Sequence, residues 1–170
     1  MTSSHDADHT RPANDSEIVI TRVFDAPREL VWQAWTQPEH IAQWYGPRGF
    51  STRVEAHDFH VGGRWRHVMI GPDGNEYPSE GVFREIVPFE RCVTTDGFGE
   101  GFEHPEGMTL PEGMVVTETF EDLGGKTRLT VRIAHPNAEE RCKHEEMGVV
   151  EGFGSMLDCF AEHLEAMARS

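Results

Sequence analysis

The chain of 170 residues has no long apolar run, half as many basic as acidic residues, and only three cysteines. No stretch approaches the roughly 18 apolar residues of a membrane-spanning helix, and the polar N-terminus lacks the apolar segment of a signal peptide. The net charge of −15 leaves no clustered basic surface for nucleic acid or an anionic membrane. Cys92, Cys142 and Cys159 lie far apart, which is typical of reduced thiols. We therefore expect a cytoplasmic protein without nucleic-acid or membrane partners.

Catalytic and cofactor motifs are missing as well. The sequence contains no G-x-S-x-G, H-E-x-x-H, P-loop or G-x-G-x-x-G pattern, so the corresponding hydrolase, metalloprotease and nucleotide-binding functions have no motif in their support. His57, Asp58 and His60 are close in sequence, but on an extended strand only Asp58 and His60 face the same side, and no third ligand is evident. We expect no metal ion and no cofactor.

The N-terminal part of the chain predicts a tail, a strand and two short helices. Residues 1–16 contain no large apolar side chain after Met1 and predict a disordered tail ahead of a single domain over residues 17–170. The β-branched run from Glu17 to Phe24 predicts a strand. Asp25 is the expected cap of a first helix, and Thr36-Gln37-Pro38-Glu39 fits a capping box for a second one.

The middle of the chain alternates short β-type runs with turn residues such as Gly62-Gly63 and Pro72-Asp73-Gly74-Asn75. Runs joined by turns this short predict an antiparallel meander. The predicted strands are Ser51 to His60, Arg64 to Ile70, Glu80 to Val87, Cys92 to Asp96, Met114 to Glu121, and Thr127 to Ala134.

The last part predicts one long amphipathic helix that starts with a capping signal at Pro136-Asn137. Apolar residues recur at helical spacing from Val149 to Met167, and they place Phe153, Met156 and Phe160 on the face that meets the sheet. Gly148, Gly152 and Gly154 cost helix stability, so we expect close packing or a bend there.

This order of elements is that of the helix-grip fold, an α+β fold. The run Thr21 to Trp32, the segments Thr36 to His40 and Trp44 to Pro47, and Asp58 with Gly62 to Trp65 resemble the single-domain bacterial proteins named after the activator of the heat-shock-protein-ninety ATPase. Those proteins belong to the START-like, birch-pollen-allergen-like SRPBCC superfamily. The resemblance covers residues 17–168 and implies a curved sheet around the C-terminal helix, with an apolar cavity between them.

The chain departs from the family pattern at three places. Gly152-Phe153 stands where Gly-Trp is usual, Glu118 stands at a usually apolar strand position, and the loop from Gly97 to Gly113 is long and acidic. These differences argue against copying any relative's ligand. The loop could fold over the mouth of a pocket as a lid, or it could be a surface insertion without a role.

Strand alternation assigns the residues that face the implied cavity. Trp65, His67 and Met69 share one face of their strand, and Glu118 shares a face with Val116 and Phe120. An imidazole and a carboxylate in an apolar cavity need each other, water or a ligand as partner. The alternatives are that His67 is a satisfied core histidine and that Glu118 lies in solvent or meets an arginine.

Glu85 follows Phe83 at the same period, so it is either a third inward polar group or a surface ion-pair partner. The predicted ligand-binding residues are Trp65, His67, Met69, Phe83, Glu85, Glu118, Phe120, Phe153, Met156 and Phe160.

Three functions remain open. The first is binding of a small apolar or aromatic ligand in the cavity. The second is an enzyme of the polyketide cyclase/dehydratase or hydrolase kind, with His67, Glu118 or Glu85 as acid or base. The third is a protein-interaction or co-chaperone-like role. The resemblance also allows a homodimer, with an exposed Trp44-Tyr45 turn in the contact.

Overall fold

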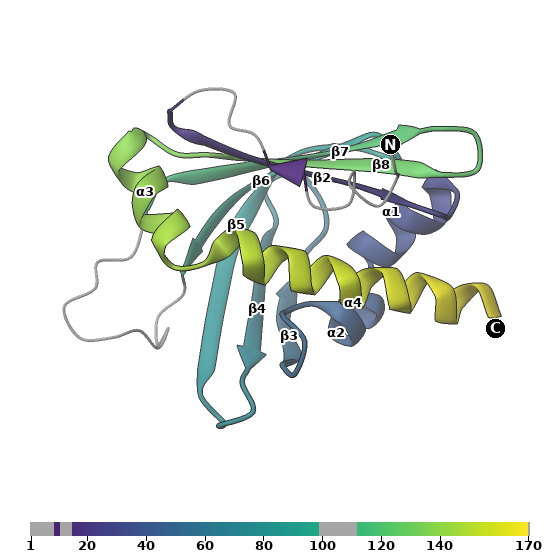
Figure 1. Cartoon of the computed structure of the whole chain (residues 1–170), viewed down its shortest axis with the longest axis horizontal. Helices are drawn as coiled ribbons and strands as arrows, with labels where there is room; N and C mark the ends of the chain where they lie inside the picture. The colour runs from purple at the N-terminus through teal and green to yellow at the C-terminus, as the bar shows by residue number, and fades with distance from the viewer. Residues whose placement is uncertain (1–8, 11–14, 99–111, 170) are drawn as a thin grey trace.

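An antiparallel sheet of eight strands curves around one long helix in the computed structural model of the chain (Figure 1). The structure describes residues 9–10, 15–98 and 112–169. The strand order is β1-β2-β8-β7-β6-β5-β4-β3, so the predicted α+β helix-grip fold is confirmed. The strands are β1 (His9–Thr10), β2 (Glu17–Phe24), β3 (Ser51–His57), β4 (Arg64–Ile70), β5 (Glu76–Val87), β6 (Arg91–Phe98), β7 (Met114–Asp122) and β8 (Thr127–Ala134). The helices are α1 (Arg28–Thr36), α2 (Pro38–Trp44), α3 (Ala138–Glu146) and α4 (Val149–Arg169).

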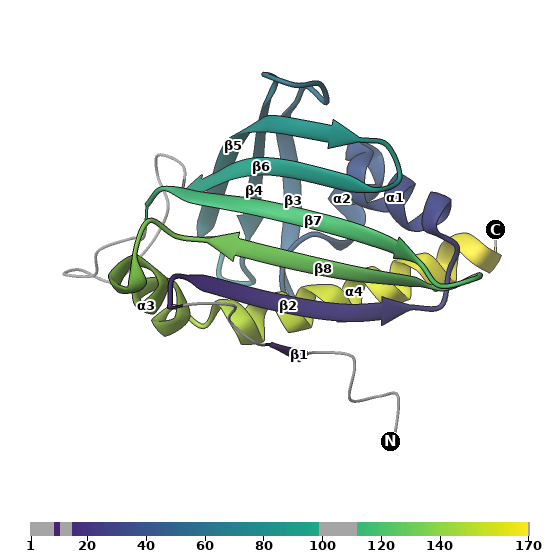
Figure 2. The same cartoon turned by 90° about the horizontal axis from the view of Figure 1, so that it is seen from above.

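The predicted meander is confirmed, because β3 to β8 pair in sequence order, each antiparallel to the next. The first long strand, β2, then pairs with β8, with Ile18 opposite Ile133. Figure 2 shows β5, β6, β7, β8 and β2 side by side, with α4 behind them. The concave face of this sheet is therefore the face that α4 covers.

The N-terminal segment differs from the predicted disorder where it is described. His9 and Thr10 pair with Thr21 and Ile20 of β2, and the Ser16 carbonyl accepts a hydrogen bond from the His135 backbone N–H at 2.9 Å. Residues 1–8 and 11–14 lie outside the described residues. The same holds for residues 99–111, which include most of the predicted lid.

Two of the three predicted helix caps are wrong. Asp25 does not cap α1, which begins after Pro27 without a side-chain cap. The Thr36 hydroxyl donates to the Trp32 carbonyl at 2.7 Å, so it closes α1 instead of capping α2. Asn137 does cap α3, since its side chain accepts from the Glu140 backbone N–H at 2.9 Å.

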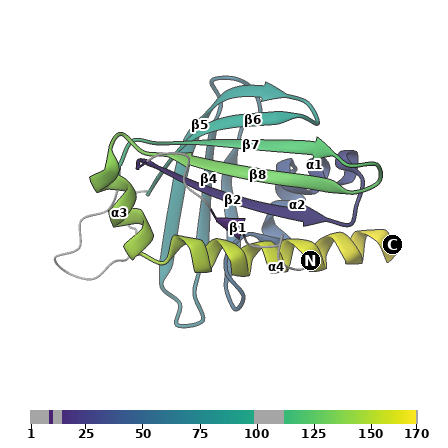
Figure 3. The ribbon, with the colours of Figure 1, turned by 45° about the horizontal axis from the view of Figure 1, so that its top comes forward.

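The predicted single C-terminal helix is two helices, α3 and α4, which meet at an angle (Figure 3). Gly148 lies between them with a φ of +84°. This left-handed conformation is open to glycine and costly for residues with a Cβ. The glycine therefore ends α3 and turns the chain into α4. None of the helices in the described part of the chain has the length and apolar content to cross a membrane.

The middle of α4 packs into an aromatic cluster. Phe160 is fully buried, and its ring centroid lies 5.0 Å from Phe24 of β2, 5.1 Å from Trp35 and 4.7 Å from Trp44. Trp35 and Trp44 stack on each other at 4.7 Å, and the Trp44 indole N–H donates to the Ala34 carbonyl at 2.9 Å. Trp44 is 3% exposed, so the prediction of an exposed Trp44-Tyr45 turn for a dimer contact is wrong.

A buried arginine joins the sheet to the same helix. Arg22 of β2 is 6% exposed, and its guanidinium donates to the Asp158 carboxylate at 2.8 Å and to the Gly154 carbonyl at 3.4 Å. Charge-assisted hydrogen bonds of this kind are stronger than neutral ones. The position of α4 over β2 is therefore set by a polar contact as well as by apolar packing.

Phe160→Ala should lower the free energy of unfolding by about 3 to 5 kcal/mol, because it removes buried apolar surface and leaves a cavity among three rings. Equilibrium unfolding in urea measures this loss. The matched control is Glu165→Ala, an exposed position on the same helix, which should change stability by less than about 0.5 kcal/mol. Equal urea midpoints for the two variants would contradict the packing described above.

Candidate functional site

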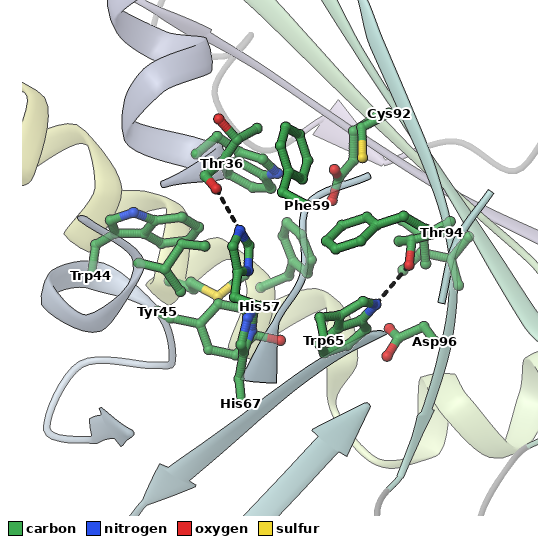
Figure 4. A pocket seen from close by; sticks show the side chains of 18 residues that line it. Thr36, Trp44, Tyr45, His57, Phe59, Trp65, His67, Cys92, Thr94 and Asp96 are labelled. Carbon is green, nitrogen blue, oxygen red and sulfur yellow. Dashed lines mark hydrogen bonds between the residues drawn. The ribbon is translucent and has the colours of Figure 1, made fainter. Parts of the chain in front are cut away.

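A cavity of about 90 Å³ lies between the sheet and the helices α1, α2 and α4 (Figure 4). Its wall is mainly aromatic and apolar, and most of its polar groups come from the sheet side. The apolar lining consists of Trp35, Ile41, Trp44, Phe59, Trp65, Phe83, Val116, Ile133, Phe153 and Met156. The lining with polar or ionisable groups consists of Thr36, Tyr45, His57, His67, Cys92, Thr94, Asp96 and Glu118.

Six of the ten residues predicted for the site line this cavity: Trp65, His67, Phe83, Glu118, Phe153 and Met156. Met69 lines a second cavity of about 220 Å³, which adjoins the first and shares Phe153 and Met156 with it.

Two predicted residues lie in the core behind the cavity wall. Phe120 is 2% exposed and packs against Trp32 and Trp35, with centroids 5.2 Å and 6.2 Å away. Phe160 lies in the cluster around Trp44. Both side chains support the cavity wall from behind.

Glu85 points out of the sheet, contrary to the prediction of an inward carboxylate. A β-bulge shifts the register between Phe83 and Glu85, so that Phe83 lies opposite Thr94 and Glu85 lies opposite Val93. An extra residue in one strand reverses the side on which the following residues lie. Glu85 is exposed and accepts a hydrogen bond from Arg91 at 2.9 Å, which is the surface ion pair considered as the alternative.

The indole of Trp65 is held by a hydrogen bond across the sheet. Its N–H donates to the Thr94 hydroxyl at 2.6 Å (Figure 4). Opposite it in β5 stands Gly81, where a Cβ would lie 2.7 Å from the Trp65 indole nitrogen and 1.9 Å from the Thr95 carbonyl oxygen. The glycine therefore leaves the room that the Trp65 ring occupies.

Glu118 of β7 faces the cavity, as predicted, and meets a second carboxyl there that the sequence analysis missed. The Trp35 indole hydrogen-bonds to the Glu118 carboxylate. Burial, opposed by this hydrogen bond and reinforced by the charge of Asp96, raises the pKa of Glu118 to about 8. Burial also raises the pKa of Asp96 to about 7, against the effect of a hydrogen bond from the Gly97 backbone. Each carboxyl is therefore partly protonated near neutral pH.

His67 of β4 is buried in the cavity wall, with 7% of its surface exposed. Neither of its ring nitrogens has a hydrogen-bond partner among the residues that the structure describes. Its ring lies 4.7 Å from Tyr45 and 4.8 Å from Trp65, measured between centroids. Burial, with a smaller effect of the His57 charge, lowers the pKa of His67 to about 3. His67 is thus a neutral imidazole whose donor and acceptor are both unused, which differs from the satisfied core histidine considered above.

His57 ends β3 next to His67, with ring centroids 6.0 Å apart. Its Nε2 lies 2.6 Å from the Thr36 carbonyl oxygen, so Nε2 carries the proton and Nδ1 has a free lone pair. Nδ1 is buried and has no partner within the described ranges. Burial lowers the pKa of His57 despite the Thr36 hydrogen bond.

Two further lining residues missed by the sequence analysis, Tyr45 and Phe59, lie outside the helices and strands. Tyr45 follows α2, and Phe59 lies in the loop between β3 and β4. Burial and the charges of Asp96 and Glu118 raise the pKa of Tyr45, which hydrogen-bonds to the Ser79 side chain. The Tyr45 hydroxyl therefore stays protonated.

A larger external groove of about 610 Å³ lies on the other side of the cavity wall. Thr36, His57 and Phe59 line both spaces, so these three side chains lie between the cavity and the groove.

The fold separates the three residues that were considered as metal ligands, His57, Asp58 and His60. Asp58 and His60 meet on the surface, with His60 Nε2 2.8 Å from the Asp58 carboxylate, while His57 turns into the cavity. Within the described residues, no group of three His, Cys, Asp or Glu side chains has the geometry to hold a metal ion.

His67→Phe should make the protein less sensitive to acid. The folded-state pKa is about 3 against 6.5 for a free histidine, so below about pH 6.5 the unfolded chain takes up a proton that the folded chain does not. The free energy of unfolding therefore decreases as the pH is lowered. Between about pH 7 and pH 5 the parent should lose about 1 to 2 kcal/mol more than the variant, as measured by urea unfolding. His60→Phe, at an exposed histidine whose pKa is raised, should give no such protection; equal protection by both changes would rule out burial as the cause.

Glu118→Gln should remove a loss of stability at alkaline pH. The folded-state pKa is about 8 against 4.5 for a free carboxyl, so the folded chain holds a proton in this range that the unfolded chain has released, and stability falls as pH rises. From about pH 6 to pH 8 the parent should lose about 1 to 2 kcal/mol more than the variant. The control Glu121→Gln, on the same strand but exposed and paired with Arg128, should follow the parent. Parallel pH curves for parent and Glu118→Gln would contradict the buried carboxyl.

Comparisons with known proteins agree with the fold. The family model described as activator of Hsp90 ATPase homolog 1-like protein matches residues 25–165. A solution NMR structure of a protein from Arthrobacter aurescens has a TM-score of 0.82 at 26% identity and covers 93% of this chain and 91% of that chain. The crystal structure of Ms6760 from Mycobacterium smegmatis has a TM-score of 0.76 at 27% identity, over 94% of each chain.

A more distant structure, the AHSA1 protein from Silicibacter pomeroyi, has a TM-score of 0.70 at 22% identity, over 89% of this chain and 99% of that chain. At this identity the likeness shows the fold alone. No curated protein sequence matches the chain. The family model extends from just before α1 almost to the end of α4, and the chain therefore belongs to the activator of Hsp90 ATPase homolog 1-like protein family.

Proposed function

We propose that the protein binds a small, largely apolar or aromatic ligand in the cavity between the sheet and α4. The observation that carries this proposal is His67, a buried imidazole in an aromatic wall with both ring nitrogens free of partners in the described chain. A buried polar group without a partner costs about 1 to 3 kcal/mol. A ligand that hydrogen-bonds to His67 recovers this energy, whereas an empty apolar cavity would be better lined by a phenyl ring.

The dimensions of the site limit the ligand. Drug-sized ligands occupy pockets of roughly 300 to 1,000 Å³, while the cavity holds about 90 Å³ and its neighbour about 220 Å³. A single ring with one short polar substituent needs part of the second space as well, because the cavity known to hold benzene measures about 150 Å³. A longer ligand would extend past Phe153 and Met156, which line both spaces.

Acid–base catalysis is the second candidate, and the two cavity carboxyls favour it. Groups with strongly shifted pKa values cluster at functional sites, and a carboxyl with a pKa of about 8, such as Glu118, is protonated at neutral pH and can act as a general acid. A co-chaperone-like role rests on the family name alone. Recovery of the ligand unchanged after incubation separates binding from catalysis.

Native mass spectrometry of the freshly purified protein tests the proposal. We expect a small-molecule adduct on the parent and on Arg64→Gln, a change on the exposed outer face of β4, and a clear loss of the adduct on His67→Phe, because that change removes both ring nitrogens and fills part of the cavity. Indole, added to protein without an adduct, should shift the amide NMR signals of Trp65 and Thr94. Equal adducts on all three proteins, or no response to indole, would contradict binding in this cavity.

A further inference from the structure

The indole N–H donors around the cavity are already used within the protein. Trp35 donates to Glu118, Trp65 donates to Thr94 at 2.6 Å, and Trp44 donates to the Ala34 carbonyl at 2.9 Å. A ligand therefore finds little donor capacity on the aromatic side of the cavity.

Once the two cavity carboxyls are ionised, most of the hydrogen-bonding groups that remain open to a ligand are acceptors. Glu118 and Asp96 present carboxyl oxygens, with four lone-pair sites on each ionised carboxylate. His57 offers its Nδ1 lone pair, because its Nε2–H is bound to the Thr36 carbonyl at 2.6 Å. His67 adds one acceptor and one donor as a neutral imidazole.

The two carboxyls also lack a positive partner. Within the described part of the chain, neither the cavity nor its neighbour is lined by an arginine or a lysine. Asp96 lines both spaces, and its carboxyl lies beside the Trp65 ring (Figure 4). Aromatic rings such as those of Trp35, Trp65 and Tyr45 attract a cation placed over their faces. Acceptors, uncompensated carboxyls and aromatic faces all complement a positively charged ligand.

We propose that the ligand is an organic cation, an amine whose ammonium group donates to Glu118 and Asp96 while its apolar part packs among the aromatic rings. This inference rests on the proposed function and narrows its ligand class. It deepens the binding proposal without requiring any chemical step.

Proton linkage gives the proposal a second signature. The ionisable groups that line the two spaces are Tyr45, His57, His67, Cys92, Asp96, Glu118 and His144. Burial lowers the pKa values of the histidines, to about 3 for His67 and about 4 for His144, and raises those of Tyr45 and Cys92. Asp96 and Glu118, with pKa values of about 7 and about 8, both titrate between about pH 6 and pH 8. A bound cation favours their ionised forms, so its affinity should rise with pH.

Three compounds of one shape test the charge preference: benzylamine, benzyl alcohol and benzoate. They share a phenyl ring and differ in carrying a positive, neutral or negative group. Isothermal titration calorimetry at pH 8 should show benzylamine binding at least tenfold more tightly than benzyl alcohol, with no detectable binding of benzoate. Benzylamine, which stays protonated throughout, should bind more weakly at pH 6, whereas the affinity of the alcohol should change in the opposite direction or remain constant.

Two variants locate the preference. Glu118→Gln and Asp96→Asn should each reduce the preference for benzylamine over the alcohol by tenfold or more, and the exposed control Glu121→Gln should retain it. If benzyl alcohol binds as tightly as benzylamine, the cation proposal is overturned while ligand binding in the cavity stands. If neither compound binds, both proposals fail. If benzylamine is preferred but Glu118→Gln and Asp96→Asn leave the preference intact, the cation binds elsewhere and the inference is wrong.

Discussion

The packing of α4 against the concave face of the sheet is the contact on which the rest of the structure depends. The middle of α4 and its N-terminal half have different environments. Phe160 is sealed among rings from β2, α1 and α2, and Arg22 holds the same region through Asp158. One and two turns earlier, Met156 and Phe153 line the two cavities. The helix is thus anchored at its middle, and the two cavities lie under its N-terminal half.

Burial acts on the ionisable groups of the cavity in one consistent way, because low polarity disfavours every charged form. It raises the pKa values of Glu118 and Asp96 to about 8 and 7 and lowers that of His67 to about 3. The acids and the bases therefore do not compensate each other as ion pairs. The free cavity approaches neutrality by protonating its acids, which leaves them able to ionise when a positive partner enters.

The fold could be predicted from the sequence wherever the backbone is regular. Strand alternation predicted that Trp65, His67 and Glu118 face inward, and they do, because β4 and β7 keep an unbroken period of two residues. The prediction failed where one residue breaks the period. The bulge beside Phe83 places the Glu85 side chain on the outer face of the sheet, and the positive φ of Gly148 divides the predicted C-terminal helix into α3 and α4. The bulge leaves no mark in the local alternating pattern. Gly148 was one of three glycines expected to allow close packing or a bend, but Gly152 and Gly154 carry the same signal and lie inside α4, so the local pattern could not tell which glycine divides the helix.

Only part of the candidate site could be predicted from the sequence. Asp96 could have been found, since Cys92, Thr94 and Asp96 alternate along one strand, but Tyr45 and His57 reach the cavity only through tertiary packing. Glu118 is the most informative residue because an apolar side chain would serve the fold better at this position, as the family resemblance also implied. A buried carboxyl without a positive partner lowers the stability of the free protein. Protonation and the Trp35 hydrogen bond offset part of that cost in the free protein, and a ligand that binds the carboxylate would offset more of it, which is the physical reason to look for function at Glu118.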